Sequence, residues 1–72
     1  MDATESATWY FDSAAAAAEA LIVILTDARK SKKTYSFGGL SVTQLLNAGL
    51  NVTGELAEVR PKLDAVPGAL RY

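Results

Sequence analysis

Few residues of this sequence are of the types that perform chemistry. The chain contains neither histidine nor cysteine, on which metal sites and acid–base catalysis near neutral pH largely depend. Its eight acidic residues are spread along the chain, and its serines and threonines have no plausible base to activate them. We therefore expect no catalytic, metal-binding or cofactor-binding site, and we predict that the protein is not an enzyme.

A basic cluster is the clearest charged feature. It comprises Arg29, Lys30, Lys32 and Lys33 and follows a stretch in which the only charges are acidic, although the net charge of the chain is only −1. Such a cluster can contact phosphate without reading base sequence, so these four residues are candidates to face DNA. The alternative is a solvated helix end, where cations complement the helix dipole.

Two apolar stretches are candidates for protein contacts. Trp9, Tyr10 and Phe11 are consecutive, and successive helical residues point about 100° apart, so all three cannot reach one core. Interfaces favour such side chains; the alternative is one core anchor with two partly exposed rings. Residues 21–25 are apolar all round a helix, so we expect Ile22, Val23 and Ile24 to meet another subunit rather than simply to be exposed.

The elements that hold these candidates belong to one domain, because the chain has only 72 residues. Residues 2–30 are predicted to form one long helix. Asp2 and Glu5 have the spacing of a capping box, and the alanine run at positions 14–18 has the highest helix propensity.

A short hairpin is predicted over residues 34–42. Gly38-Gly39 is a two-residue turn signal, since glycine reaches positive φ without strain. Folding about this turn pairs Phe37 with Leu40 and Tyr35 with Val42 on one apolar face.

A second helix is predicted over residues 43–60, either continuous or broken between Asn47 and Gly54, where helix propensity is poor. Thr43 is the favoured N-cap, and Ser41 with Gln44 is the alternative. A rival interpretation places strands at residues 40–46 and 50–53. Pro61 is expected to end or kink the helix near Arg60.

Residues 67–72 are predicted to form an extended tail, in which Leu70 and Tyr72 need an external surface. The predicted fold is therefore α+β: a long helix, a two-stranded antiparallel hairpin, a second helix and a tail. The apolar run at positions 14–25 falls short of the roughly 20 residues that span a bilayer, so we expect no membrane contact. With an acidic N-terminus and no targeting segment, we expect the protein to be soluble and intracellular.

This order of elements resembles the gpW family, the small head–tail joining proteins of tailed bacteriophages. The likeness is carried by residues 35–43 and Leu45, which look like the family's hairpin followed by a Ser-Val-(Ser/Thr)-x-Leu start of the second helix, here Ser41, Val42, Thr43 and Leu45. An alanine-rich first helix with a basic end also fits.

The resemblance implies a virion protein of the phage neck, present in the host cytoplasm during assembly. It implies a homo-oligomeric ring that matches the portal symmetry, a dodecamer, and that bridges the portal protein and the next neck or tail protein. DNA would pass through the lumen without sequence specificity. The alternative function is a small helical nucleic-acid-binding or regulatory protein that uses the basic cluster.

Overall fold

The computed structural model describes residues 4–38 and 41–72 of the chain. Along the sequence these residues form β1 (Thr4–Phe11), α1 (Ala14–Ser31), α2 (Val42–Ala48), β2 (Leu50–Glu55), α3 (Val59–Asp64) and β3 (Ala69–Arg71).

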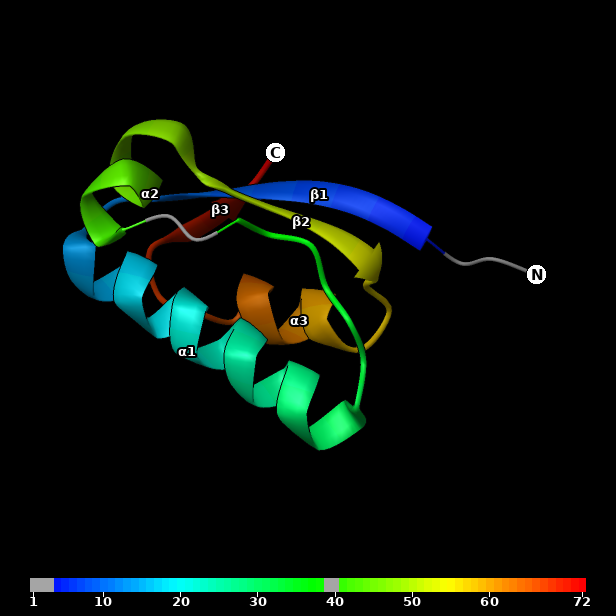
Figure 1. Cartoon of the computed structure of the whole chain (residues 1–72). Helices are drawn as coiled ribbons and strands as arrows, with labels where there is room; N and C mark the ends of the chain where they lie inside the picture. The colour runs from blue at the N-terminus through cyan, green and yellow to red at the C-terminus, as the bar shows by residue number, and fades with distance from the viewer. Residues whose placement is uncertain (1–3, 39–40) are drawn as a thin grey trace.

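The strands form one antiparallel sheet in which β1 lies between β2 and β3. Figure 1 shows this sheet as one layer, with α1 and α3 as a second layer beneath it and α2 at one end. Helices on one face of an antiparallel sheet are an α+β arrangement, so the predicted fold class is confirmed. The predicted order of helix, hairpin, helix and tail is wrong.

The first correction concerns β1, which was expected to be the start of a helix over residues 2–30. Trp9 and Phe11 point into the core, while Thr8 and Tyr10 alternate with them on the opposite face. This alternation over residues 8–11 is the pattern of a half-buried strand, and it outweighs the capping-box spacing. Glu5 lies within β1. Asp2 lies outside the described residues.

The first helix, α1, begins only after Ser13. The Ser13 hydroxyl accepts a hydrogen bond from the backbone nitrogen of Ala16 at 3.2 Å, which caps the helix. The alanine run follows and places the small residues Ala16 and Ala17 in the core, where they let the helix pack closely. Lys32 ends the helix in a left-handed conformation with φ of 54°.

The predicted hairpin over residues 34–42 is wrong. Ser36 instead forms a single bridge with Thr53 of β2, with both backbone nitrogen–oxygen distances at 2.9 Å. Val42 begins α2, so it is not a cross-strand partner of Tyr35. An isolated hairpin is marginal in water, and the edge of an existing sheet offers Ser36 a better partner. The predicted pairing of Phe37 with Leu40 falls partly outside the described residues, because residues 39–40 are not among them.

The start of α2 confirms one of the two predicted caps. The Ser41 hydroxyl accepts from the backbone nitrogen of Gln44 at 3.3 Å, and the Gln44 side-chain oxygen accepts from the Ser41 nitrogen at 2.8 Å. These two bonds complete a capping box, so the assignment of the N-cap to Thr43 is wrong.

The second predicted helix, residues 43–60, breaks where its helix propensity is poor. Gly49 follows α2 with φ of +79°, and the chain then enters β2. The rival interpretation of residues 50–53 as a strand is confirmed, but this strand pairs with β1 and not with residues 40–46.

The last part of the chain also differs from its prediction. Pro61 lies in the first turn of α3, where its missing N–H removes no intrahelical bond, so it does not end a helix near Arg60. Residues 67–72 are not a tail: β3 pairs with β1, and the backbone nitrogen of Tyr72 donates to the Thr8 oxygen at 2.8 Å.

The core lies between the sheet and the helices. Its largest fully buried side chains are those of Trp9, Ile24, Leu45, Leu50, Leu56 and Leu63. In the described part of the chain, no helix is both long enough and apolar enough to cross a membrane.

Candidate functional site

The most buried charged group of the structure is the carboxylate of Asp27 on the inner face of α1. Its Oδ1 accepts a hydrogen bond from Lys62 Nζ of α3 at 2.8 Å, and its Oδ2 accepts one from the Tyr35 hydroxyl at 2.5 Å. The carboxylate therefore connects α1, α3 and the extended segment that follows α1. We call these three residues the Asp27 network.

The network shifts the pKa values of its members in opposite directions. Burial alone would raise the pKa of Asp27, but the hydrogen bonds from Lys62 and Tyr35 outweigh it and lower that pKa below its usual value. Burial and the bond to Asp27 raise the pKa of the Tyr35 hydroxyl. The hydrogen bond to Asp27 also raises the pKa of Lys62. All three groups therefore keep their ordinary neutral-pH protonation states.

Both oxygens of Asp27 are occupied by bonds within the protein, so this arrangement holds elements together rather than presenting a free base. A cavity of about 300 Å³ adjoins it, lined by Ile22, Val23, Thr26, Asp27, Lys30 and Lys62. Sequence reasoning missed this network. Asp27 follows Ile24 by three residues on the buried face of α1, and an acid at such a position was the available signal.

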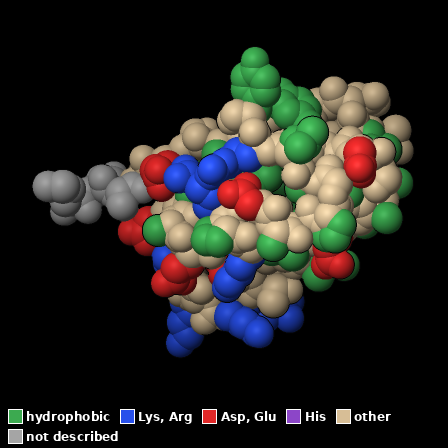
Figure 2. Space-filling model, turned by 180° about the vertical axis from the view of Figure 1, so that it is seen from behind, with side chains coloured by type: hydrophobic (Ala, Val, Ile, Leu, Met, Phe, Trp, Pro, Cys, Tyr) green, Lys and Arg blue, Asp and Glu red, His purple; other side chains and the backbone are tan. Residues whose placement is uncertain are grey.

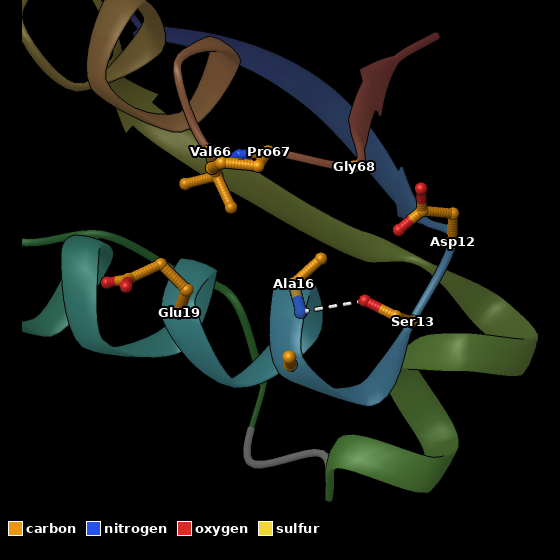
Figure 3. Close-up of a pocket in the computed structure, with 8 residues that line it drawn as sticks. Asp12, Ser13, Ala16, Glu19, Val66, Pro67 and Gly68 are labelled. Atoms are coloured by element: carbon orange, nitrogen blue, oxygen red, sulfur yellow. Dashed lines mark hydrogen bonds between the residues drawn. The ribbon is translucent and has the colours of Figure 1, made fainter.

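A second hollow lies at the N-terminal end of α1 (Figure 3). Its volume is about 360 Å³, and its walls come from the start of α1 and the segment between α3 and β3: Asp12, Ser13, Ala15, Ala16, Glu19, Val66, Pro67 and Gly68. Figure 3 shows that the Ser13 hydroxyl is directed to the Ala16 nitrogen that it caps. Among the described residues, no group of three or more acidic side chains could hold a metal ion.

An aromatic patch lies on the outward face of the sheet, and we define it as Tyr10, Leu70 and Tyr72. Leu70 and Tyr72 are 70% and 95% exposed, and Tyr10 and Leu70 are register partners on β1 and β3. The Tyr10 and Tyr72 rings meet edge to face with centroids 5.9 Å apart. Figure 2 shows hydrophobic side chains projecting at the upper edge of the molecule, on the sheet side, while Lys and Arg side chains lie both at the lower edge and in the upper half of this face.

Gly49 forms one wall of this patch. A Cβ atom at this position would lie 2.9 Å from Tyr10 Cε1 and 2.9 Å from the backbone oxygen of Trp9. The absence of a side chain therefore lets one edge of the Tyr10 ring approach the backbone that follows α2.

The predicted interface residues divide between the core and the surface. Trp9, Phe11 and Ile24 are buried in the core, so their prediction as surface contacts is wrong for the folded monomer. The reason is the period of each element: the strand turns Trp9 and Phe11 inward together, and α1 turns Ile24 inward. Tyr10, Ile22, Leu70 and Tyr72 are exposed, and Val23 is half-buried.

The basic cluster also divides, here into three exposed cations and one cation that is ion-paired. Arg29, Lys30 and Lys32 are exposed, and none of them makes an ion pair within the described part of the chain. Lys33 differs, because its ammonium lies 3.8 Å from Glu55 and 3.6 Å from Glu58. These acids offset its charge toward any external phosphate.

Comparisons with protein families, with curated proteins and with solved structures find no match to this chain.

Proposed function

We propose that this chain is a structural adaptor that joins protein subunits in a larger assembly. The observation that carries the proposal is the presence of two separate exposed apolar surfaces on one small domain. One is the aromatic patch on the sheet, and the other includes Ile22 and Leu25 of α1, which are 60% and 53% exposed. Figure 1 places the sheet and α1 in different layers, so the two surfaces can serve two neighbours.

The exposed side chains are of the types that protein interfaces favour. Interface cores are enriched in tyrosine and apolar residues, and contiguous exposed apolar surface on a small protein marks a contact site. By contrast, the most buried polar groups bond to one another in the Asp27 network. This distribution favours a role in binding proteins over a role in converting a substrate.

More specifically, we propose that the chain is a neck protein of a tailed phage. Its copies would form a ring that bridges the portal and the next neck or tail protein. Its support is the likeness of Ser41, Val42, Thr43 and Leu45 to the start of the second helix in gpW-like proteins, at the place where α2 begins. The predicted hairpin lends no support, because residues 34–42 do not form it. Arg29, Lys30 and Lys32 would be the residues that face DNA in the lumen.

The experiment that tests the proposal measures whether the chain is a fixed component of virus particles. We expect quantitative mass spectrometry of purified particles to find it at a copy number close to that of the portal protein. Leu70→Thr combined with Tyr72→Ser removes the two most exposed side chains of the patch but keeps the strand, and should lower incorporation. Ala57→Ser, an exposed change away from both surfaces, is the control. Absence of the chain from particles would refute the neck assignment.

The second candidate function is nucleic-acid binding by the free chain. The observation that favours it is the exposure of Arg29, Lys30 and Lys32 without ion pairs in the described structure. DNA affinity of the isolated chain that falls steeply with salt, and that is lost when these three residues become glutamine, would favour it over the adaptor.

A further inference from the structure

A pocket with both apolar and basic walls lies between α1 and α3, beside the Asp27 network. Figure 1 shows these two helices next to each other in the layer beneath the sheet. The pocket has a volume of about 300 Å³, and all of its lining residues except Lys62 of α3 belong to α1. We call this space the α1–α3 pocket.

Helical periodicity arranges the α1 side of the pocket in two rows. Residues four positions apart are neighbours on a helix surface, so Ile22, Thr26 and Lys30 form one row. Val23 and Asp27 form a second row, which is less exposed and lies closer to the core. Each row begins with an apolar residue and ends with a charged one. The pocket therefore has an apolar end near Ile22 and a charged end near Lys30.

The charged end has hydrogen-bond donors that a ligand can use. The Lys62 ammonium donates to Asp27 at 2.8 Å, but an ammonium has three N–H groups, and 55% of the Lys62 side chain is exposed. Lys30 is exposed and makes no ion pair within the described part of the chain. The two ammonium charges exceed the single carboxylate charge of Asp27, so this end is complementary to one anionic group.

The apolar end limits which anion fits. Ile22 is 60% exposed and Val23 is half-buried. A phosphate of a nucleic acid would leave this apolar surface in water, because the phosphate backbone carries no apolar side chain. An acidic protein segment with a neighbouring apolar residue would remove the surface from water. The combination of the two ends therefore favours a protein ligand over a nucleic acid.

The distance between the two ends matches an extended chain. Val23 and Asp27 are four residues apart, which is about 6 Å along the axis of an α-helix. Side chains two positions apart on an extended strand point to the same side and are separated by about 7 Å. An apolar residue and an acidic residue two positions apart can therefore occupy both ends of the pocket at once.

We propose that the α1–α3 pocket binds an extended acidic segment of a partner protein. The carboxylate of this segment lies between the ammonium groups of Lys30 and Lys62. An apolar side chain two positions away covers Val23 and Ile22. The inference rests on the proposed function, because it gives the chemistry of the neighbour that meets the α1 surface of the adaptor.

This assignment separates Lys30 from the rest of the basic cluster. Lys30 lines the pocket, whereas Arg29 and Lys32 do not and remain the candidates to face DNA in the neck assembly. The hollow at the N-terminal end of α1 does not suit the same ligand, since Asp12 and Glu19 line it and would repel a carboxylate. An acidic segment is therefore directed to the end of α1 that carries Lys30.

An NMR titration of the full-length chain with short peptides tests the proposal. The probes are Leu-Ala-Glu and Glu-Ala-Leu, blocked at both ends so that glutamate supplies the only charge, and the same peptides with glutamine in its place. We expect at least one glutamate peptide to shift the backbone amide signals of Val23, Thr26 and Lys30 in a saturable way. Its affinity should exceed that of its glutamine counterpart by about twofold to fivefold, the contribution of an exposed ion pair.

Two matched pairs of variants locate the binding. Lys30→Gln should abolish the preference for glutamate and Arg29→Gln should largely keep it, because both remove one exposed charge but only Lys30 lines the pocket. Ile22→Thr should weaken binding by about twofold to fivefold. Leu25→Thr should not, since Leu25 is similarly exposed but lies outside the pocket. Lys62 is left unchanged, because it also holds Asp27.

Several results would overturn the inference. Equal affinities of the glutamate and glutamine peptides would show that the carboxylate is not recognised. An equal loss in Arg29→Gln and Lys30→Gln would show attraction to the basic cluster as a whole. The absence of a saturable shift with every peptide up to about 20 mM would show that the pocket does not bind such a segment.

A short single-stranded DNA provides the comparison with the other class of ligand. If it shifts the same amide signals and binds more tightly than every peptide, the pocket residues serve nucleic acid and the inference is wrong. The titrations concern the free chain, so they can fail while the particle experiment succeeds, and the reverse.

Discussion

At the residue scale, the carboxylate of Asp27 connects parts of the chain that are distant in sequence. Its partners are Tyr35, eight positions away, and Lys62, thirty-five positions away. Asparagine at this position would keep only one of the two acceptor oxygens, so either the buried Tyr35 hydroxyl or the Lys62 ammonium would lose its acceptor. Buried polar groups that lose a partner cost more free energy than the bond itself contributed.

We therefore expect Asp27→Asn to lower the free energy of unfolding by about 2 kcal/mol at neutral pH. The effect should depend on pH. The pKa of Asp27 is lowered by folding, so its contribution is present above the unfolded value near 4 and is lost as pH falls through the folded value. The difference between wild type and variant in denaturant titrations should thus narrow as pH falls below about 4.

At alkaline pH the same network should persist. Folding raises the pKa values of Tyr35 and Lys62, so their contributions are lost only as pH rises through the folded values, above about 10. Glu19→Gln changes an exposed carboxylate and serves as the control, with a pH profile like that of wild type. A constant difference between Asp27→Asn and wild type at all pH values would contradict the account.

Gly49 provides a second residue-scale prediction. Its φ of +79° with ψ of 172° is open essentially only to glycine, and a Cβ would contact the Trp9 backbone oxygen at 2.9 Å. We expect Gly49→Ala to destabilise the domain by about 2–4 kcal/mol, measured by chemical denaturation. Removing the Tyr10 ring as well should not restore stability, because the backbone contact and the strain remain. Full rescue by Tyr10→Ala would show that the ring alone is responsible.

Some residue-scale features were visible in the sequence and others were not. The Ser41 and Gln44 capping box depends on residues three positions apart, so its spacing was visible and offered it as the alternative to Thr43. The partners of Asp27 could not be found in this way, because no local pattern brings Tyr35 and Lys62 to one carboxylate. The exposure of Ile22 was predictable, since a small domain cannot bury every side of a helix.

At the element scale, the strands account for most of the difference between the sequence interpretation and the structure. β1 carries a period-two pattern that ends at Phe11, two residues before the capping residue Ser13. That boundary was available in the sequence. By contrast, β3 has only three residues and no periodicity to detect, and it exists because β1 offers it an edge.

Because β3 is paired within the sheet, deletion of residues 69–72 should change the stability of the fold. As a free tail, residues 69–72 would be dispensable for folding. As a paired strand, they supply backbone hydrogen bonds to β1, and Ala69 packs against the core. We expect deletion of these residues to cost about 2–3 kcal/mol, since each bond contributes about 1 kcal/mol.

The melting temperature of the chain that lacks residues 69–72 should be compared with that of the Tyr72→Ser variant. Tyr72→Ser keeps the strand and removes one exposed ring, so its melting temperature should lie close to that of wild type. A truncated chain that melts at the wild-type temperature would show that β3 does not contribute to the fold.

At the scale of the whole molecule, the pattern of predicted segments indicated the fold class but not the topology of the sheet. Long helical and short extended segments in a chain of this length indicated an α+β domain, and that is what forms. The strand order could not be deduced, because it depends on which distant segments pair. β2 and β3 both pair with β1, although each is separated from it in sequence by helices.

The central position of the first strand has a consequence for the synthesis of the protein. During translation, β1 leaves the ribosome first, but both of its neighbours are made much later; the Thr8 side chain, for example, bonds Asn51, 43 positions downstream. Until those residues emerge, Trp9 and Phe11 have no sheet to join, and α1 alone is local enough to form. The nascent chain therefore exposes an unpaired strand until β2 has been made, and chaperones protect such segments during this interval. Non-local pairing of this kind is also slow, so completion of the sheet should limit the rate of folding.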